Sequence, residues 1–108
     1  MNTPADRRLE PRRPFNGRGV VVAPGLEIAC IISDQSPSGM RVRLERQLAL
    51  PARVMLVDVA EALAHECDVA WKKGNEAGLK RLSQSSLRGL APSRLLPARE
   101  AWLRAGGR

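Results

Sequence analysis

Residues 40–45 read Met40-Arg41-Val42-Arg43-Leu44-Glu45, a strict alternation of apolar and charged side chains. Successive side chains of a β-strand point to opposite faces, so this period of two predicts a strand with one face in a core and the other in water. Residues 64–73 alternate in the same way, with Cys67, Val69 and Trp71 on the apolar side. The sequence therefore predicts two amphipathic strands and places Trp71 in the core.

Four further strands are predicted around these two. Each is a short apolar run bounded by turn residues such as Pro24-Gly25 or Gly74-Asn75. The runs cover residues 18–23, 26–33, 53–59 and 77–82. Six short strands separated by turns predict an all-β domain, an antiparallel barrel or sandwich. Closing the sheet into a barrel would leave no exposed edge.

The chain beyond residue 82 has a different character. Residues 97–105 can form a short helix, because Pro97 suits a first helical turn and Gly106 follows the predicted end. Few of its residues are apolar, so we expect a weakly docked helix or a frayed tail. The predicted organisation is a flexible basic arm over residues 1–17, a barrel over residues 18–82 and a partly helical extension over residues 83–108.

Composition narrows the class of protein. The chain has 108 residues, of which 44% are hydrophobic, which is typical of one folded domain. It has only one Phe, two Trp and no Tyr, whereas barrels that bind single-stranded nucleic acid offer several rings for stacking. Cys30, His65 and Cys67 lack the spacing of a zinc site, so we expect no metal and two buried, reduced thiols. No signal peptide or membrane span is visible, which predicts a cytoplasmic protein.

The net charge of +7 is unevenly distributed. Residues 1–18 contain five arginines and two acidic residues, and residues 80–108 contain seven basic residues and one acidic residue. Residues 19–79 have six basic and eight acidic residues and are nearly neutral. Basic flanks suit an anionic partner, which can be a nucleotide, a nucleic acid or an acidic surface. A solubilising tail is the alternative explanation.

The first candidate motif lies in the basic arm. Arg8 and Arg12 stand four residues apart, with Arg7 and Arg13 beside them. The planar guanidinium fork matches a phosphate or the O6/N7 edge of guanine, and it can also stack on a base. On its own, an arginine-rich N-terminus is common and carries little information.

The second candidate motif is Asp34-Gln35-Ser36-Pro37-Ser38-Gly39, between two predicted strands. Asp and Ser favour tight turns, and Gly permits positive φ or a close approach, so a turn alone explains these residues. In a functional interpretation, the Asp34 carboxylate accepts hydrogen bonds from the N1 and N2 edge of guanine. Ser36 then adds a hydroxyl contact, and Gly39 leaves room for the ligand.

The order of these motifs resembles the PilZ family. An R-x-x-x-R arm precedes one strand, and a second strand ends in D-x-S-x-x-G. The stretch Asp68-Val69-Ala70-Trp71-Lys72-Lys73-Gly74-Asn75-Glu76-Ala77-Gly78-Leu79 is similar to the family's last hairpin. The resemblance covers residues 6–82. The chain departs from the family's usual pattern at Gln35, at Pro37 and at Leu82, where the family often has Phe.

The resemblance implies a six-stranded PilZ-type barrel that binds the bacterial second messenger cyclic di-GMP, often as a stacked dimer. It assigns guanine and phosphate contacts to Arg8 and Arg12, with Arg7 and Arg13 as further candidates for neutralising phosphate. It also implies that Asp34, Ser36 and Gly39 shape the pocket on the barrel side.

We therefore expect a non-enzymatic cyclic di-GMP receptor that signals in trans to a partner protein. No nucleophile–base pair, metal set or phosphate loop is apparent in the sequence, and His65 has no readable catalytic partner. Two alternatives remain open: a PilZ-like interaction module without a nucleotide, and a small basic barrel that binds nucleic acid.

Overall fold

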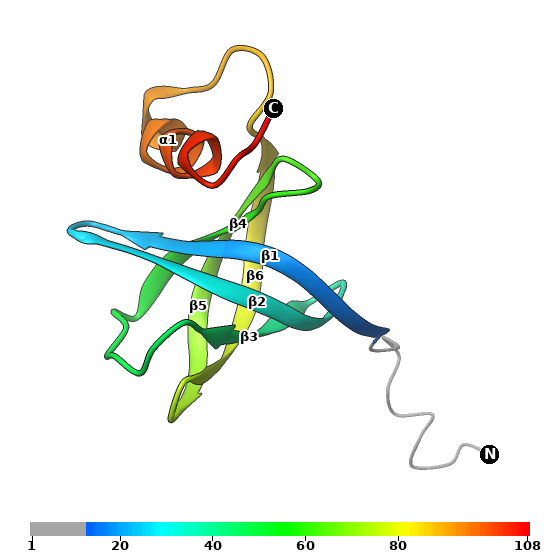
Figure 1. The fold of residues 1–108 in the computed structure, drawn as a ribbon, viewed down its shortest axis with the longest axis vertical. Coiled ribbons are helices and arrows are strands. Elements are labelled where there is room, and N and C mark those ends of the chain that lie inside the picture. The colour runs from blue at the N-terminus through cyan, green and yellow to red at the C-terminus, as the bar shows by residue number, and fades with distance from the viewer. Residues whose placement is uncertain (1–12) are drawn as a thin grey trace.

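The computed structural model describes residues 13–108, with side chains from Asn16 onward. Six antiparallel strands form a closed barrel in the order β1-β2-β3-β6-β5-β4 (Figure 1). The 3-10 helix η2 (Ser93–Leu95) leads into helix α1 (Leu96–Arg104). The strands are β1 (Arg13–Ala23), β2 (Leu26–Ser36), β3 (Gly39–Leu44), β4 (Arg53–Asp58), β5 (Leu63–Lys73) and β6 (Glu76–Ser86). The predicted six-stranded barrel with a short C-terminal helix is confirmed.

Three strands are longer by more than one residue than the sequence pattern predicts. β2 runs to Ser36, past the predicted end at residue 33, so Asp34 and Ser36 belong to this strand rather than to the turn. β1 begins at Arg13, ahead of the predicted start at residue 18, and Arg13 pairs with Gln35 of β2. β6 also continues past Leu82. The register between β5 and β6 skips this residue between two neighbouring pairs, so Leu82 lies in a bulge. A bulge turns the side chain out of the regular alternation, and Leu82 is exposed. The apolar pattern ends at Leu82, whereas the strand does not.

The barrel interior contains the first hydrophobic cluster. Strand β3 follows its sequence pattern, with Met40, Val42 and Leu44 buried and the two arginines between them exposed. Burying an aliphatic side chain of this size contributes about 1.5–3 kcal/mol. The other buried members are Val21, Ile28, Cys30, Ile32, Val54, Leu56, Cys67, Ala77 and Leu79.

A second hydrophobic cluster lies between the outer face of the barrel and α1. Val20 and Val22 face the helix, while Val21 faces the barrel interior, so all three consecutive valines are buried. Trp102 fills the interface, and its Nε1 donates a hydrogen bond of 3.0 Å to the Val59 carbonyl. The expectation of a weakly docked or frayed C-terminus is therefore wrong, because α1 covers β1 and β4 through a buried aromatic side chain (Figure 1).

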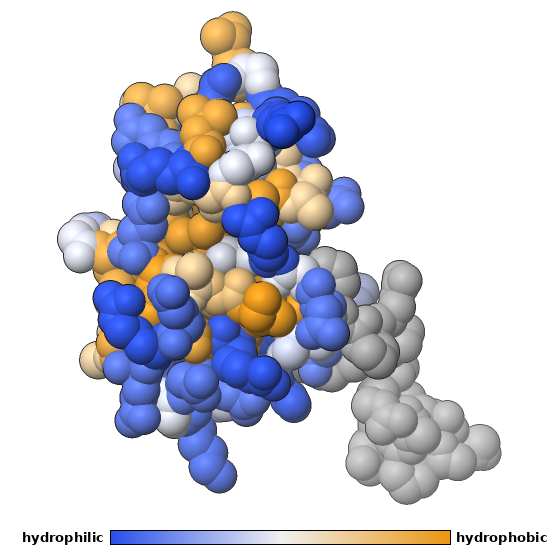
Figure 2. All heavy atoms as spheres, in the orientation of Figure 1, coloured by the Kyte–Doolittle hydropathy of each residue, from blue (hydrophilic) through white to orange (hydrophobic). Residues whose placement is uncertain are grey.

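The cysteines lie inside the protein as free thiols. Burial raises the pKa of both Cys30 and Cys67 to about 12, so both stay protonated at neutral pH. The face shown in Figure 2 mixes hydrophilic side chains with smaller apolar areas. Within residues 13–108, no helix has the length and apolarity that crossing a membrane requires.

Candidate functional site

A row of registered residues crosses four strands on the outer surface of the barrel. Asp34 of β2 pairs with Arg41 of β3, Arg41 pairs with Gly78 of β6, and Gly78 pairs with Trp71 of β5. Paired residues in a sheet share a face, so a carboxylate, a guanidinium and an indole are brought together. The Nε of Arg41 lies 3.8 Å from Oδ2 of Asp34.

Trp71 does not lie in the core as predicted: its side chain is 43% exposed. The register between β5 and β6 shifts between Val69 and Trp71. This bulge adds one residue and reverses the alternation, so Val69 packs against the interior and Trp71 faces outward. The indole lies against Gly78, where a Cβ atom would collide with it. The Trp71 ring therefore lies on the surface and packs against the backbone of Gly78.

An open groove lies beside this row. Its volume is about 260 Å³, slightly below the roughly 300–1,000 Å³ of pockets that enclose a whole drug-sized ligand. It is therefore large enough to receive a small group but not to enclose a whole drug-sized ligand. The groove contains an indole and two cationic side chains, and its lining residues are Ser38, Gly39, Met40, Arg41, Ala70, Trp71, Gly78, Leu79 and Lys80.

The turn between β2 and β3 forms one end of the groove. Asp34 is half-buried and Ser36 is buried. The Ser36 hydroxyl lies 3.5 Å from both the Gly39 carbonyl oxygen and the Ser38 hydroxyl, which are weak contacts within the turn. Gly39 is needed by the fold itself, because a Cβ there would collide with the Leu79 carbonyl oxygen of β6.

The arm residues Arg7, Arg8 and Arg12 lie outside the described residues, so their assignment to the ligand stays a prediction. The place where the arm joins the barrel is defined. Arg13 pairs with Gln35 and Pro14 pairs with Asp34, so the chain enters the barrel beside the turn. The described part of the chain therefore begins next to the second motif.

An arginine on β6 joins the turn to the barrel. The Nη1 of Arg81 donates a hydrogen bond of 2.8 Å to the Ser36 carbonyl, and its Nε donates one of 3.1 Å to Nδ1 of His65. Burial and the nearby positive charge of Arg81 lower the pKa of His65 to about 4, so the imidazole is neutral and can accept this bond. Sequence analysis missed Arg81, because it lies more than 40 residues from the turn in sequence.

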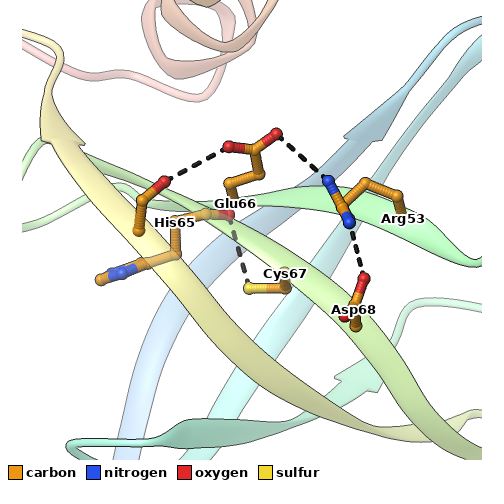
Figure 3. Close-up of polar contacts among 6 residues, drawn as sticks. Arg53, His65, Glu66, Cys67 and Asp68 are labelled. Carbon is orange, nitrogen blue, oxygen red and sulfur yellow. Dashed lines mark hydrogen bonds and ion pairs between the residues drawn. The ribbon is translucent and has the colours of Figure 1, made fainter.

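The remaining charges on β5 form a surface cluster of a different kind. Figure 3 shows Arg53 between the carboxylates of Glu66 and Asp68, at 3.6 Å and 2.7 Å, with the His65 ring pointing away from them. All three charged groups are solvent-accessible, so each ion pair is worth at most about 1 kcal/mol. The predicted solvated face of this strand is confirmed. No group of three potential metal ligands occurs among residues 13–108.

No curated protein and no solved structure matched this chain. The family model of the PilZ domain matches residues 6–91, which is most of the sequence. The match includes the arm, all six strands and the turn between β2 and β3. The closed six-stranded barrel agrees with it, and the chain therefore belongs to the PilZ domain family.

Proposed function

We propose that this protein is a cyclic di-GMP receptor that acts in trans on a partner protein. PilZ domains are in general receptors for this nucleotide and are binding domains rather than enzymes. The observation that carries the proposal is the junction of the arm and the barrel. The first described residue of the chain, Arg13, pairs with Gln35 next to Asp34, and Asp34 is in register with Arg41, which supports an interaction of the preceding arginines with this turn.

Each group at this junction matches a part of the ligand. Cyclic di-GMP carries two negative phosphates and two guanines. In our proposal, Arg8 and Arg12 contact guanine and phosphate, with Arg7 and Arg13 adding positive charge. The Asp34 carboxylate accepts from the guanine N1 and N2 edge, and the exposed Trp71 ring offers a stacking surface.

Signalling would follow from the position of the arm. We propose that the bound nucleotide fixes the arm against the turn and so changes the surface that a partner protein meets. A barrel without catalytic machinery of its own would transmit the signal only through such a contact.

Isothermal titration calorimetry of the full chain with cyclic di-GMP tests the proposal. An affinity of about −6 kcal/mol or better gives measurable heat at tens of micromolar ligand. Arg8→Ala, Arg12→Ala and Asp34→Ala should each weaken binding while the thermal unfolding midpoint stays close to wild type. Arg46→Ala is the matched control, because Arg46 is exposed and forms an ion pair with its own neighbour Glu45.

Three results would count against the proposal. Absence of heat with the wild-type chain would favour a PilZ-like interaction module without a nucleotide. Wild-type affinity in all three site variants would refute the site assignment. Tight, strongly salt-dependent binding to random oligonucleotides that excess cyclic di-GMP does not displace would favour a nucleic-acid-binding barrel.

A further inference from the structure

Arg81 binds three consecutive carbonyl groups of the turn between β2 and β3. Its backbone N–H donates a hydrogen bond of 2.7 Å to the Ser38 carbonyl. Its Nη1 donates to the Ser36 carbonyl at 2.8 Å and also to the Pro37 carbonyl. A turn normally leaves such carbonyls to water, whereas here one residue of β6 satisfies all three.

The same guanidinium is anchored at its other side in the barrel. Nε donates to His65, and Nη2 lies 2.8 Å from the Met40 sulfur. The His65 and Met40 side chains are both buried and cannot move freely. The buried side chains thus fix the position of the Arg81 guanidinium, and the guanidinium in turn fixes the carbonyl groups of the turn. The turn therefore has the rigidity of the barrel rather than that of a surface loop.

The positive charge of Arg81 is not cancelled at this place. Its hydrogen-bond partners within residues 13–108 are carbonyl oxygens, a neutral imidazole and a thioether, none of which is charged. By contrast, Arg41 contacts the carboxylate of Asp34 and Arg53 contacts that of Asp68. A half-buried, uncompensated cation beside the groove attracts an anion, because screening by water is weaker there.

We propose that Arg81 is the positioning residue of the nucleotide site: it fixes the backbone of residues 36–38 in the binding shape before ligand arrives. This inference rests on the proposed function and deepens it. Asp34 and Gly39 flank the fixed backbone, so their spacing is set in the free protein. A preorganised site binds more tightly because less freedom is lost on binding.

The geometry requires arginine at this position. The planar fork reaches two carbonyls, an imidazole and a thioether at once, whereas a lysine ammonium is a single point on a flexible stem. Arg81→Lys therefore keeps the charge and loses the clamp. Arg81→Gln loses the charge as well. The pair of variants separates positioning from electrostatic attraction.

Two measurements on the full chain test the inference. Amide hydrogen exchange of the free protein, followed by NMR, should be at least about tenfold faster in both variants at the amides of Ser36, Ser38 and Gly39, and unchanged in β4 and β5. Titration calorimetry should show cyclic di-GMP affinity reduced about tenfold in Arg81→Lys and further in Arg81→Gln. A change in the His65 imidazole nitrogen shifts should accompany both. Arg53→Lys and Arg53→Gln are matched controls, because Arg53 contacts only surface carboxylates in its described ion pairs.

The outcomes are distinct. Unchanged exchange at the amides of Ser36, Ser38 and Gly39 in both variants overturns the clamp. Faster exchange with wild-type affinity overturns its role in binding. Wild-type affinity in Arg81→Lys alone assigns Arg81 a purely electrostatic role and also overturns positioning. If the wild-type chain binds no cyclic di-GMP, the proposed function fails, and hydrogen exchange still decides whether Arg81 holds the turn. If Arg81→Gln does not fold, Arg81→Lys supplies both measurements.

Discussion

At the scale of single residues, two glycines set how closely the strands and side chains of the site approach. A Cβ on Gly39 would meet the Leu79 carbonyl oxygen, and a Cβ on Gly78 would meet the Trp71 indole. Gly39 therefore has a structural reason to be glycine that does not depend on any ligand. Loss of binding in a Gly39 variant would not by itself prove a ligand contact.

Gly78→Ala should displace the Trp71 ring and cost about 1–3 kcal/mol of unfolding free energy, because the added methyl group has no space. In a Trp71→Ala background the space is free, so the same substitution should cost much less. Urea unfolding of the four proteins in this double-mutant cycle measures the coupling. Equal costs in both backgrounds would show that the indole does not rest on Gly78.

Trp71 should also report ligand binding. The chain has two tryptophans, of which Trp71 is exposed and Trp102 is buried under α1. Cyclic di-GMP should quench the fluorescence of Trp71 and should not affect the fluorescence of Trp102. Trp71→Phe should therefore remove most of the fluorescence change that the ligand causes. Trp71→Ala should weaken binding about tenfold, since stacking of a base on an aromatic ring is worth roughly 1–3 kcal/mol. Full affinity in Trp71→Ala would exclude stacking at this ring.

His65 should make stability depend on pH. Its pKa is lowered from 6.5 to about 4 in the folded protein, so the unfolded chain takes up a proton first as the pH falls. The contribution of neutral His65 is complete above pH 6.5 and is lost as the pH falls toward 4. Unfolding free energy should drop by about 2 kcal/mol between pH 7 and pH 5.

His65→Gln is the control for this pH effect, because Gln can still accept the Arg81 hydrogen bond and does not titrate. Denaturant unfolding at both pH values gives the difference between the two proteins. That difference also removes the opposite contribution of Asp58, whose pKa is raised by burial. Parallel pH dependence in the two proteins would contradict the lowered pKa of His65.

Sequence reasoning placed some site residues well and others wrongly, for identifiable reasons. The turn predicted over residues 34–39 is shorter in the structure, because Asp34 and Ser36 belong to the end of β2 and Gly39 begins β3, so only residues 37–38 form the turn. The three residues still lie around this turn, since turn-forming residues act locally. Trp71 was placed in the core because alternation was extended through a bulge that the pattern does not reveal. No sequence pattern identifies Arg81 as a site residue. Its partners come from β2, β3 and β5, and they meet only in the closed barrel.

At the scale of elements, the packing of α1 determines which side chains of β1 and β4 are buried. Strand β3 alternates because water covers its outer side, whereas β1 has three consecutive buried valines because α1 covers its outer side. The helix is also attached by polar contacts. Arg104 forms two hydrogen bonds with the Glu27 carboxylate, and the Arg18 guanidinium donates to the Ala105 carbonyl. The helix was predicted within one residue of its bounds, but its docking depends on Trp102, whose partner the sequence does not identify.

Trp102→Ala should cost roughly 3–5 kcal/mol of unfolding free energy, because it empties the interface between α1 and the barrel. Trp102→Phe should cost less, since it keeps most of the packing and loses the hydrogen bond to Val59. Leu103→Ala on the exposed side of the same helix is the control and should change stability by less than about 0.5 kcal/mol. Guanidinium chloride unfolding measures all three. Unchanged stability in Trp102→Ala would mean that α1 does not fold cooperatively with the barrel.

At the scale of the whole molecule, the barrel is complete without the residues before β1. Strand β1 pairs with β2 and β4, and its pairing begins at Arg13. The strand pattern of the sequence predicts an all-β barrel or sandwich, and the resemblance to the PilZ family implies the barrel. The closure itself, through the β1–β4 pair, connects residues far apart in sequence and follows from no local pattern.

A chain that starts at Arg13 should therefore keep the unfolding midpoint of the full protein within a few degrees and lose most of its affinity for cyclic di-GMP. The deletion removes Arg8 and Arg12 and no described strand. Thermal unfolding by circular dichroism and titration calorimetry test the two halves of this prediction. Retained affinity would assign binding to the barrel alone, and a large loss of stability would show that the arm belongs to the fold.

The closed barrel limits how a partner protein can be recognised. Each of the six described strands pairs with a neighbour on both sides along part of its length, so none of them offers a full-length free edge to which a partner strand could add. Over the doubly paired segments, recognition depends on side chains and loops rather than on backbone pairing. A partner specific for this protein would have to read its surface chemistry, which a single substitution can change without altering the fold.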